Sequence, residues 1–266
     1  MNQSRERNWA LITGASSGIG EAFAKHFAQE GWNVVLIARS LDKLNLLADS
    51  LKKANSVETM VMQADLSLPK APHEIYEEIK AREIHVHALV NNAGFGAVGP
   101  FTQIDVSRQL EMIDVNVKAL LALTHLFLPL MIERKSGFVI NVSSTASFQP
   151  VPYLATYAAT KAFVTIFSEA LWSECHGTGV KIINLCPGRT KTNFGVVASQ
   201  KESVNDIRPT QTSEEVVNFA FRAMHGRKPT LVTNSFDNAL RFMERFVSRK
   251  WVALIARQLT RRTGYC

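Results

Sequence analysis

Short apolar runs alternate with amphipathic stretches along most of this chain. The predicted strands are residues 9–13, 33–38, 58–64, 86–91, 137–143, 180–186 and 230–233. Helical periodicity lies between them, at residues 19–30, 41–54, from about 72, 105–133, 153–174 and from 213 to about 225. Strands that alternate with helices are typical of a parallel sheet. We therefore expect an α/β fold, a doubly wound parallel sheet of about seven strands with helices on both faces.

Several residues mark where the predicted helices begin and end. Gly31 follows the first helix, and Pro72 lies near the start of the third. Ser213 is expected to cap a helix that carries acidic residues in its first turn. Residues 189–211 are polar and lack clear periodicity, so this segment is either a mobile lid or a plain surface loop.

The chain is expected to form one domain over residues 1–234, with residues 235–266 as a helical extension of it. Residues 236–262 are predicted as one basic amphipathic helix. Its apolar positions recur at helical spacing, and its arginines follow another stripe: Phe236, Leu240, Met243, Val247, Trp251, Leu254 and Ile255, with Arg241, Arg245 and Arg249. The interpretation we favour packs the apolar face onto the domain. The alternatives are contact with anionic lipid or with a partner protein.

Positive charge is concentrated near the C-terminal end. Residues 1–221 contain 20 Lys and Arg and 21 Asp and Glu, whereas residues 222–266 contain 10 basic and 2 acidic residues. The net charge of +7 therefore belongs to the last part of the chain and not to the whole surface. A general nucleic-acid-binding surface is not indicated, and we expect no nucleic-acid partner.

The cysteines and histidines do not indicate a metal site. Cys175, Cys186 and Cys266 lack a metal-ligand spacing, and the first two lie among apolar residues, as buried free thiols do. His85 and His87 could share one face of a strand, but no third ligand accompanies them.

Composition places the chain among ordinary globular proteins, with 46% hydrophobic and 20% charged residues. Residues 1–8 are polar and charged, unlike a signal peptide. No uninterrupted apolar run approaches the roughly 20 residues of a membrane span. We therefore expect a cytoplasmic protein.

A glycine-rich turn joins the first predicted strand to the first predicted helix. It consists of Thr13, Gly14, Ala15, Ser16, Ser17, Gly18, Ile19 and Gly20. Glycines permit a tight turn and a close approach of backbone to a pyrophosphate, and a helix N-terminus offers unpaired N–H groups. The spacing G-x-x-x-G-x-G differs from the commoner G-x-G-x-x-G, and a tight loop without a ligand is the alternative. Its place between strand and helix favours a dinucleotide site.

The end of the second strand indicates which dinucleotide binds. A site for NAD carries a carboxylate there for the ribose hydroxyls, but this chain has Ala38, Arg39 and Ser40. A guanidinium can pair with a 2′-phosphate through two hydrogen bonds. We therefore predict NADP(H) as the cofactor. The alternative is that Arg39 is a solvated loop charge.

At this point the sequence resembles the short-chain dehydrogenase/reductase family over about residues 8–234. The matching motifs occur in family order: Thr13-Gly14-x-x-x-Gly18-x-Gly20, Asp65, Asn91-Asn92-Ala93-Gly94, Asn116, Ser144, Tyr157-x-x-x-Lys161 and Pro187-Gly188. The resemblance implies a Rossmann-like fold, with Asp65 near the adenine and Thr192 near the nicotinamide. The long basic C-terminal segment departs from the commonest members and puts the family's usual tetramer in doubt. We expect a homo-oligomer, either a dimer or a tetramer.

The resemblance and the motifs together define the residues expected to contact NADP(H). These are Gly14, Ser16, Ser17, Gly18, Ile19, Gly20, Arg39, Ser40, Asp65, Leu66, Asn92, Ala93, Gly94, Tyr157, Lys161, Pro187, Gly188, Thr190 and Thr192.

Four residues are candidates for catalysis. Hydride addition to a carbonyl produces an alkoxide that needs a proton, and Tyr157 can supply it. Lys161 lies one helical turn away on the same face, so its charge is expected to lower the phenol pKa from about 10. Ser144 is placed to bond the substrate oxygen, and Asn116 to hold a water that links Lys161 to solvent. Each could instead be an ordinary structural residue, and Ser143 is the alternative to Ser144.

The segments expected to line the substrate site are apolar, at residues 95–101, 148–154 and 194–197. They favour a lipophilic carbonyl or alcohol, although they could equally pack on the protein itself. We therefore predict an NADP(H)-dependent oxidoreductase with Tyr157 as general acid/base. The alternatives are a 3-oxoacyl thioester reductase, whose basic tail attracts an acidic carrier, and a non-catalytic NADP(H)-binding sensor or scaffold.

Overall fold

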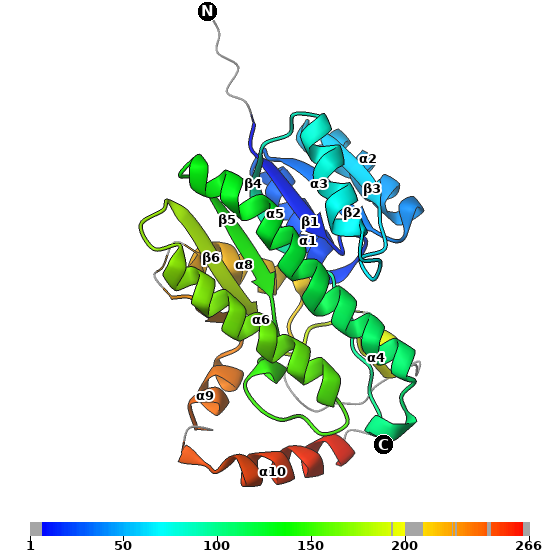
Figure 1. The fold of residues 1–266 in the computed structure, drawn as a ribbon, viewed down its shortest axis with the longest axis vertical. Coiled ribbons are helices and arrows are strands. Elements are labelled where there is room, and N and C mark those ends of the chain that lie inside the picture. The colour runs from blue at the N-terminus through cyan, green and yellow to red at the C-terminus, as the bar shows by residue number, and fades with distance from the viewer. Residues whose placement is uncertain are drawn as a thin grey trace, which may run out of the picture.

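The computed structural model describes residues 7–192, 194–199, 210–224, 226, 228–243 and 246–262. It contains one seven-stranded sheet in the order β3-β2-β1-β4-β5-β6-β7, with every neighbouring pair parallel. The strands are β1 (Trp9–Thr13), β2 (Asn33–Ala38), β3 (Thr59–Gln63), β4 (Val86–Asn91), β5 (Gly137–Val142), β6 (Val180–Cys186) and β7 (Thr230–Val232). The predicted α/β fold and its seven strands are confirmed (Figure 1).

Helices cover both faces of the sheet. They are α1 (Gly18–Gln29), α2 (Leu41–Asn55), α3 (Ala71–Ala81), α4 (Val106–Ile113), α5 (Leu120–Glu133), α6 (Ala155–Glu174), α7 (Phe194–Ser199), α8 (Ser213–Ala223), α9 (Ser235–Met243) and α10 (Arg249–Arg262). Short helical turns are η1 (Phe101–Gln103), η2 (Asp114–Ala119) and η3 (Thr145–Ser147).

The core consists of two apolar layers, one on each face of the sheet. Alternate residues of β1 enter opposite layers: Ile12 packs with α1, α2 and α8, whereas Leu11 packs with α3 and α5. This alternation explains the unbroken apolar strands, because a strand covered on both faces needs apolar side chains at every position. Phe27 and Phe127, both fully buried, are among the largest side chains of the two layers.

The strand order reverses between β1 and β4. The chain runs outward from β1 to β3 and then crosses to β4 on the other side of β1. In open α/β sheets, ligands bind beyond the carboxyl ends of the strands at such a reversal. The glycine-rich turn after β1 and the loop after β4 therefore meet at the expected binding position.

A row of buried polar side chains crosses four strands in register. Asn91 on β4 pairs with Asn141 on β5, which pairs with Asn184 on β6 and then Thr230 on β7. The Asn91 Nδ2 donates to Asn141 Oδ1 at 2.9 Å, and Asn184 Nδ2 donates to Thr230 Oγ1 at 3.1 Å. Asn141 Nδ2 donates to Ser168 Oγ on α6 at 3.0 Å. This row was not predicted from the sequence.

The long helix predicted over residues 105–133 is interrupted. It consists of α4 and α5 joined by η2, a π-helical turn. The combined stretch Val106–Glu133 is long and apolar enough to cross a membrane by length and composition. Its buried residues, such as Leu123 and Met131, belong to the apolar layer on one face of the sheet. This stretch is therefore explained as a core helix of the fold.

Two other helix predictions are corrected. The cap of α8 is Thr212 and not Ser213: Thr212 Oγ1 accepts from the Glu215 N–H at 3.1 Å, and Glu215 Oε2 accepts from the Thr212 N–H at 2.8 Å. This reciprocal capping box leaves Ser213 as the first helical residue. The single helix predicted over residues 236–262 is two helices, α9 and α10. Serine at position 248 favours a helix end, and its carbonyl accepts the first hydrogen bonds of α10.

Other predictions concern the loop after β6 and the cysteines. Residues 193 and 200–209 lie outside the described residues, but Phe194–Ser199 forms α7, so this part is not a plain loop. Cys175 and Cys186 are buried free thiols, as predicted. Cys266 lies outside the described residues. The division at residue 234 stays a prediction.

Candidate active site

The glycine-rich turn has the backbone geometry of an anion-binding site. Gly14 and Gly18 have φ angles of +66° and +60°, which residues with a Cβ rarely adopt. A Cβ on Gly20 would overlap the carbonyl oxygen of Gly14. Ser17 precedes α1 without a side-chain hydrogen bond to the helix start. The first N–H groups of α1 are therefore not capped by this side chain and can bind a phosphate.

Thr13 connects this turn to the loop after β4, a role that was not predicted for it. Its Oγ1 accepts from the backbone N–H groups of Asn92 and Ala93, both at 3.0 Å. The Asn92 Nδ2 donates to the Thr13 carbonyl at 2.9 Å. The Asn92–Gly94 segment and the glycine turn therefore form one rigid edge of the site. A threonine that directly precedes the first glycine was the signal for this contact.

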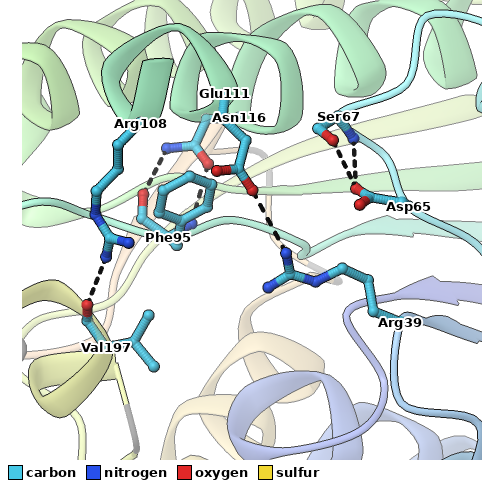
Figure 2. A network of polar contacts seen from close by, with 8 residues as sticks. All are labelled: Arg39, Asp65, Ser67, Phe95, Arg108, Glu111, Asn116 and Val197. Carbon is cyan, nitrogen blue, oxygen red and sulfur yellow. Dashed lines mark hydrogen bonds and ion pairs between the residues drawn. The ribbon is translucent and has the colours of Figure 1, made fainter. Parts of the chain in front are cut away.

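Arg39 and Asp65 lie side by side at the ends of β2 and β3 (Figure 2). The Arg39 side chain is 65% exposed, and its Nη1 lies 3.4 Å from Glu111 Oε1 on α4. Hydrogen bonding from the Ser67 backbone N–H lowers the pKa of Asp65, and the charge of Arg39 lowers it further. An exposed guanidinium with one weak partner is free to bind an additional anion, such as a 2′-phosphate.

The remaining predicted cofactor residues fall into two groups. Thr192 is brought to the glycine turn, because a Cβ on Gly18 would lie 3.0 Å from Thr192 Cγ2. Pro187 accepts a backbone bond from Thr145, and Thr190 Oγ1 donates to the Gly188 carbonyl at 3.0 Å. Near the adenine end, Leu66 is buried in the core layer and Ser40 is exposed at the start of α2. Burial of its side chain leaves Leu66 only its backbone for a ligand.

Tyr157 and Lys161 lie on the same side of α6, as the spacing predicted. Both side chains are buried, and Lys161 Nζ lies 5.9 Å from the centroid of the Tyr157 ring. Lys161 Nζ donates to the Val142 carbonyl at 2.8 Å, at the carboxyl end of β5. A Cβ on Gly94 would lie 3.4 Å from this nitrogen, so the lysine also approaches the loop after β4.

The predicted lowering of the Tyr157 pKa is wrong in this structure, because the net shift is upward. Burial raises the pKa of Tyr157 to about 12, and a hydrogen bond with the Ser144 side chain opposes this rise. Burial also lowers the pKa of Lys161 to about 8. Desolvation outweighs the favourable charge for two groups enclosed by protein.

The geometry separates the two candidate serines. Ser144 is half-buried, and its side chain lies close enough to the Tyr157 hydroxyl to oppose the rise of the phenol pKa. Ser143 is buried, and its Oγ donates to the Lys161 carbonyl and bonds Thr165 Oγ1, each at 2.8 Å. Ser143 therefore anchors β5 to α6, and Ser144 is the serine beside the phenol.

Asn116 lies in the π-helical turn η2 and holds the loop after β4. Its Oδ1 accepts from the Phe95 N–H at 3.1 Å, and its Nδ2 donates to the Phe95 carbonyl at 3.0 Å and to Thr160 Oγ1 at 3.1 Å. These bonds link α6 to the loop that carries Gly94. The expected water between Asn116 and Lys161 stays a prediction.

The helix α7 covers the phenol. The Phe194 ring lies 5.1 Å from the Tyr157 ring, centroid to centroid. Arg108 on α4 donates to the Val197 carbonyl at 2.7 Å, and the Val98 N–H donates to the Ala198 carbonyl at 3.0 Å (Figure 2). These contacts come from two other segments and hold α7 against the site, while the mobility of the predicted lid stays a prediction.

A small pocket lies next to α6. Most of its lining is apolar, and it is formed by Ala97, Gly99, Phe101, Ile104, Gln109, Met112, Tyr153, Ala155 and Thr156. Two of its lining residues, Ala97 and Met112, belong to the same apolar cluster as Tyr157. Within the residues that the structure describes, no group of three or more His, Cys, Asp or Glu side chains could hold a metal ion.

Comparison with known proteins agrees with this geometry. The family model described as short chain dehydrogenase matches residues 8–203. The chain belongs to the short-chain dehydrogenase family. A solved short-chain dehydrogenase from Sphingobium yanoikuyae in complex with NADPH has a TM-score of 0.80 and 29% identity, and the match covers 91% of this chain and 96% of that one.

Curated relatives of this short-chain dehydrogenase include proteins with lipid-related names. Hydroxysteroid dehydrogenase-like protein 1 of Gallus gallus is 38% identical over 186 residues, which are 69% of this chain and 56% of that protein. Very-long-chain 3-oxoacyl-CoA reductase of Mus musculus is 38% identical over 195 residues, which are 71% of this chain and 61% of that protein. The matches thus span little more than half the length of these relatives.

Proposed function

We propose that this chain is an NADP(H)-dependent oxidoreductase that transfers a hydride between the nicotinamide and a carbonyl or hydroxyl group of a lipophilic small molecule. One observation carries the proposal. Tyr157 is buried beside Ser144, lies on the same helix side as Lys161 and packs with Ala97 and Met112, two residues that line a mostly apolar pocket.

The residues divide the chemistry between them. The reduced cofactor supplies the hydride when it is bound. Tyr157 then gives its hydroxyl proton to the substrate oxygen, so the alkoxide becomes an alcohol and the phenol becomes a phenolate. Ser144 donates a hydrogen bond to the same substrate oxygen, and the Lys161 charge stabilises the phenolate until it regains a proton. In the oxidative direction the phenolate accepts the alcohol proton.

Burial of the phenol suits the reductive direction. A pKa raised to about 12 keeps Tyr157 protonated at neutral pH, which is the form that donates a proton. An anion formed there is costly unless a cation is close, and Lys161 is the buried cation on the same side of the helix. This pairing gives both residues a reason to be buried together.

The cofactor preference rests on Arg39. Its exposed side chain lies beside Asp65 at the ends of β2 and β3, and no carboxylate occupies the end of β2. The glycine turn supplies the N–H groups for the pyrophosphate, so the residues present fit NADP(H). The NADPH complex of the Sphingobium yanoikuyae relative supports the same choice.

A second candidate is reduction of a 3-oxoacyl thioester. The observation that favours it is the 38% identity with very-long-chain 3-oxoacyl-CoA reductase of Mus musculus. The basic residues near the C-terminal end would attract an acidic carrier or the phosphates of coenzyme A. A cytoplasmic location and a homo-oligomer, dimer or tetramer, stay predictions.

Oxidation of NADPH on a panel of ketones, aldehydes and 3-oxoacyl thioesters tests the proposal. Tyr157→Phe should lower turnover by at least about a hundred-fold, because it removes the proton donor. It should leave NADPH binding, followed by nicotinamide fluorescence, nearly intact. Tyr76→Phe is the matched control, because Tyr76 packs against Phe127 on the far side of the sheet from α1.

The results separate the candidates. Turnover restricted to acyl thioesters would select the second function. Unchanged turnover in Tyr157→Phe would refute the mechanism. NADPH binding without turnover on any substrate of the panel would favour a binding protein.

A further inference from the structure

We propose that the C-terminal end of this chain binds the surface of an anionic lipid membrane. The contact surface, here called the C-terminal apolar patch, lies on α9, α10 and the segment between them. Its members are all exposed: Phe242, Phe246, Val247, Trp251, Leu254 and Ile255. Figure 1 shows α9 and α10 at one end of the molecule, beyond the helices that cover the sheet.

The apolar face of α10 points away from the protein. Val252, Ala253, Ala256 and Thr260 are its buried or half-buried positions, and they fall on one side of the helix. Trp251 and Ile255 are 59% and 53% exposed and fall on the opposite side, because helical residues advance by about 100° each. The packing that the sequence analysis favoured for this face is therefore wrong for these two residues.

The small residues explain why the helix has this orientation. Ala253 and Ala256 allow α10 to lie close to the protein, whereas Trp251, Leu254 and Ile255 stay in solvent. Exposed aromatic side chains extend the surface toward α9. Phe246 is 77% exposed, and its ring lies 5.5 Å from the Phe242 ring, centroid to centroid. A contiguous group of large apolar side chains at the surface marks a contact site. Side chains of Phe236, Leu240 and Met243 lie outside the described residues.

The charged residues of α10 are all basic. Arg249, Lys250 and Arg257 are exposed on α10, and the sequence of this helix contains no acidic residue. Arg241 on α9 is already engaged, because its guanidinium lies 4.5 Å from the Phe148 ring and 3.9 Å from Glu169. Among the described residues, Lys250 and Arg257 are exposed cations that flank Leu254 on α10, because helical residues advance by about 100° each. This combination of aromatic, aliphatic and basic side chains is that of a helix lying in a membrane interface.

The positive charge of this region favours an anionic lipid surface over a second copy of the chain as the binding partner of the patch. A second copy would bring the same excess of 10 basic over 2 acidic residues in residues 222–266 against itself. Like charges at an interface oppose association. An anionic bilayer supplies both an apolar layer for Trp251 and Ile255 and negative headgroups for the basic side chains. The proposal does not depend on the proposed catalytic function.

Vesicle flotation with the full chain tests the proposal. The probes are vesicles of phosphatidylcholine with and without phosphatidylglycerol. We expect the chain to float with the anionic vesicles at low salt and to be released as salt is raised. Lys250→Gln should lower the bound-to-free ratio about five-fold. Phe246→Ala with Trp251→Ala should lower it at least ten-fold.

Two matched controls lie on α2, outside the patch. Leu46→Ala removes a similarly exposed apolar side chain, and Lys53→Gln removes a similarly exposed cation. Both should leave flotation unchanged. Far-ultraviolet circular dichroism and the NADPH affinity check that each variant keeps its fold, and an unchanged NADPH affinity keeps this test separate from that of the proposed function.

Three results would overturn the proposal. Absence of flotation with anionic vesicles would refute lipid binding. Flotation equal in the patch and control variants would assign it to another surface. The patch would belong to a second copy if the parent chain did not float and sedimentation showed that Trp251→Ala dissociates an oligomer.

Discussion

The Phe194 ring covers the Tyr157 ring, with centroids 5.1 Å apart and planes inclined by 51°. Phe194 belongs to α7 and Tyr157 to α6, so this contact joins the segment after β6 to the helix that carries the candidate proton donor. Arg108 holds the same segment through the Val197 carbonyl. Solvent access to the phenol therefore depends on the position of α7.

Phe194→Ala should lower the pKa of Tyr157 from about 12 toward 10. Burial is the main cause of the raised pKa, and removal of the covering ring admits water that stabilises the phenolate. Tyrosinate absorbance is followed against pH for the parent chain and for Phe194→Ala, each with and without Tyr157→Phe. The difference within each pair gives the titration of Tyr157 alone. Phe194→Leu is the control, since it keeps an apolar cover. An identical titration for the alanine and leucine variants would contradict the role of the ring.

Lys161 should make the protein more stable as pH rises from about 8 to about 10.5. Its folded pKa is lowered to about 8 from 10.5, so in this interval the unfolded chain binds more protons than the folded one. The free energy of unfolding then rises with pH, by an amount on the order of 3 kcal/mol. Lys161→Met should remove this rise.

Urea unfolding at several pH values measures the effect. Exposed Lys53→Met is the control and should keep the pH dependence of the parent chain. The raised pKa of Cys186, about 11 instead of 9, acts in the opposite direction above about pH 9, and that of Tyr157 does so above about pH 10, so the comparison is made below pH 9. Parallel curves for the parent and Lys161→Met would show that the lysine is not desolvated.

Arg39→Asp should reverse the cofactor preference. The change removes the cation that faces a 2′-phosphate and introduces a carboxylate for ribose hydroxyls, so NADPH affinity should fall about ten- to hundred-fold while NADH affinity changes little. Glu111→Gln should raise NADPH affinity by up to about five-fold, because it frees Arg39 from its partner at 3.4 Å. Fluorescence titration with both cofactors measures these constants. Equal losses for NADPH and NADH would refute the assignment of Arg39.

Gly20→Ala should impair both stability and cofactor binding. Its Cβ would overlap the backbone carbonyl of Gly14, so the phosphate turn must move, at a cost of about 1–3 kcal/mol in unfolding free energy. Gly31→Ala, at the other end of α1 and in open space, should cost about 1 kcal/mol for its positive φ and leave NADPH affinity unchanged. Thermal unfolding and fluorescence titration separate the two. Full NADPH affinity in Gly20→Ala would show that the turn is not the phosphate site.

Patterns of local sequence were sufficient for the strands and for the motifs that meet at the site. Runs such as residues 33–38 are apolar at every position, and only a strand covered on both faces explains them at that length. Tyr157 and Lys161 share a helix side because their spacing is one helical turn. The glycine turn was predictable because its positive φ angles and close backbone contacts require glycine.

Contacts between distant segments could not be predicted in this way. Thr13 meets Ala93 across 80 positions, and Arg108 meets Val197 across 89. The pKa of Tyr157 depends on its enclosure by α7, which has no clear periodicity in the sequence. The outward face of α10 was also misjudged, because periodicity identifies an apolar face but not what that face contacts.

The row of amides from Asn91 to Asn184 fixes the register of β4 with β5 and of β6 with β7 by hydrogen bonds, independently of how the apolar side chains around it pack. Aliphatic side chains around it are interchangeable as long as they fill the same volume, whereas a strand displaced by one residue would lose its amide partners. Asn92 and Ser144 follow β4 and β5 by one and two residues, so the positions of these two site residues depend on this alignment. Sequence changes in α7 or in the C-terminal helices can therefore leave the spacing between the loops after β4 and β5 unchanged.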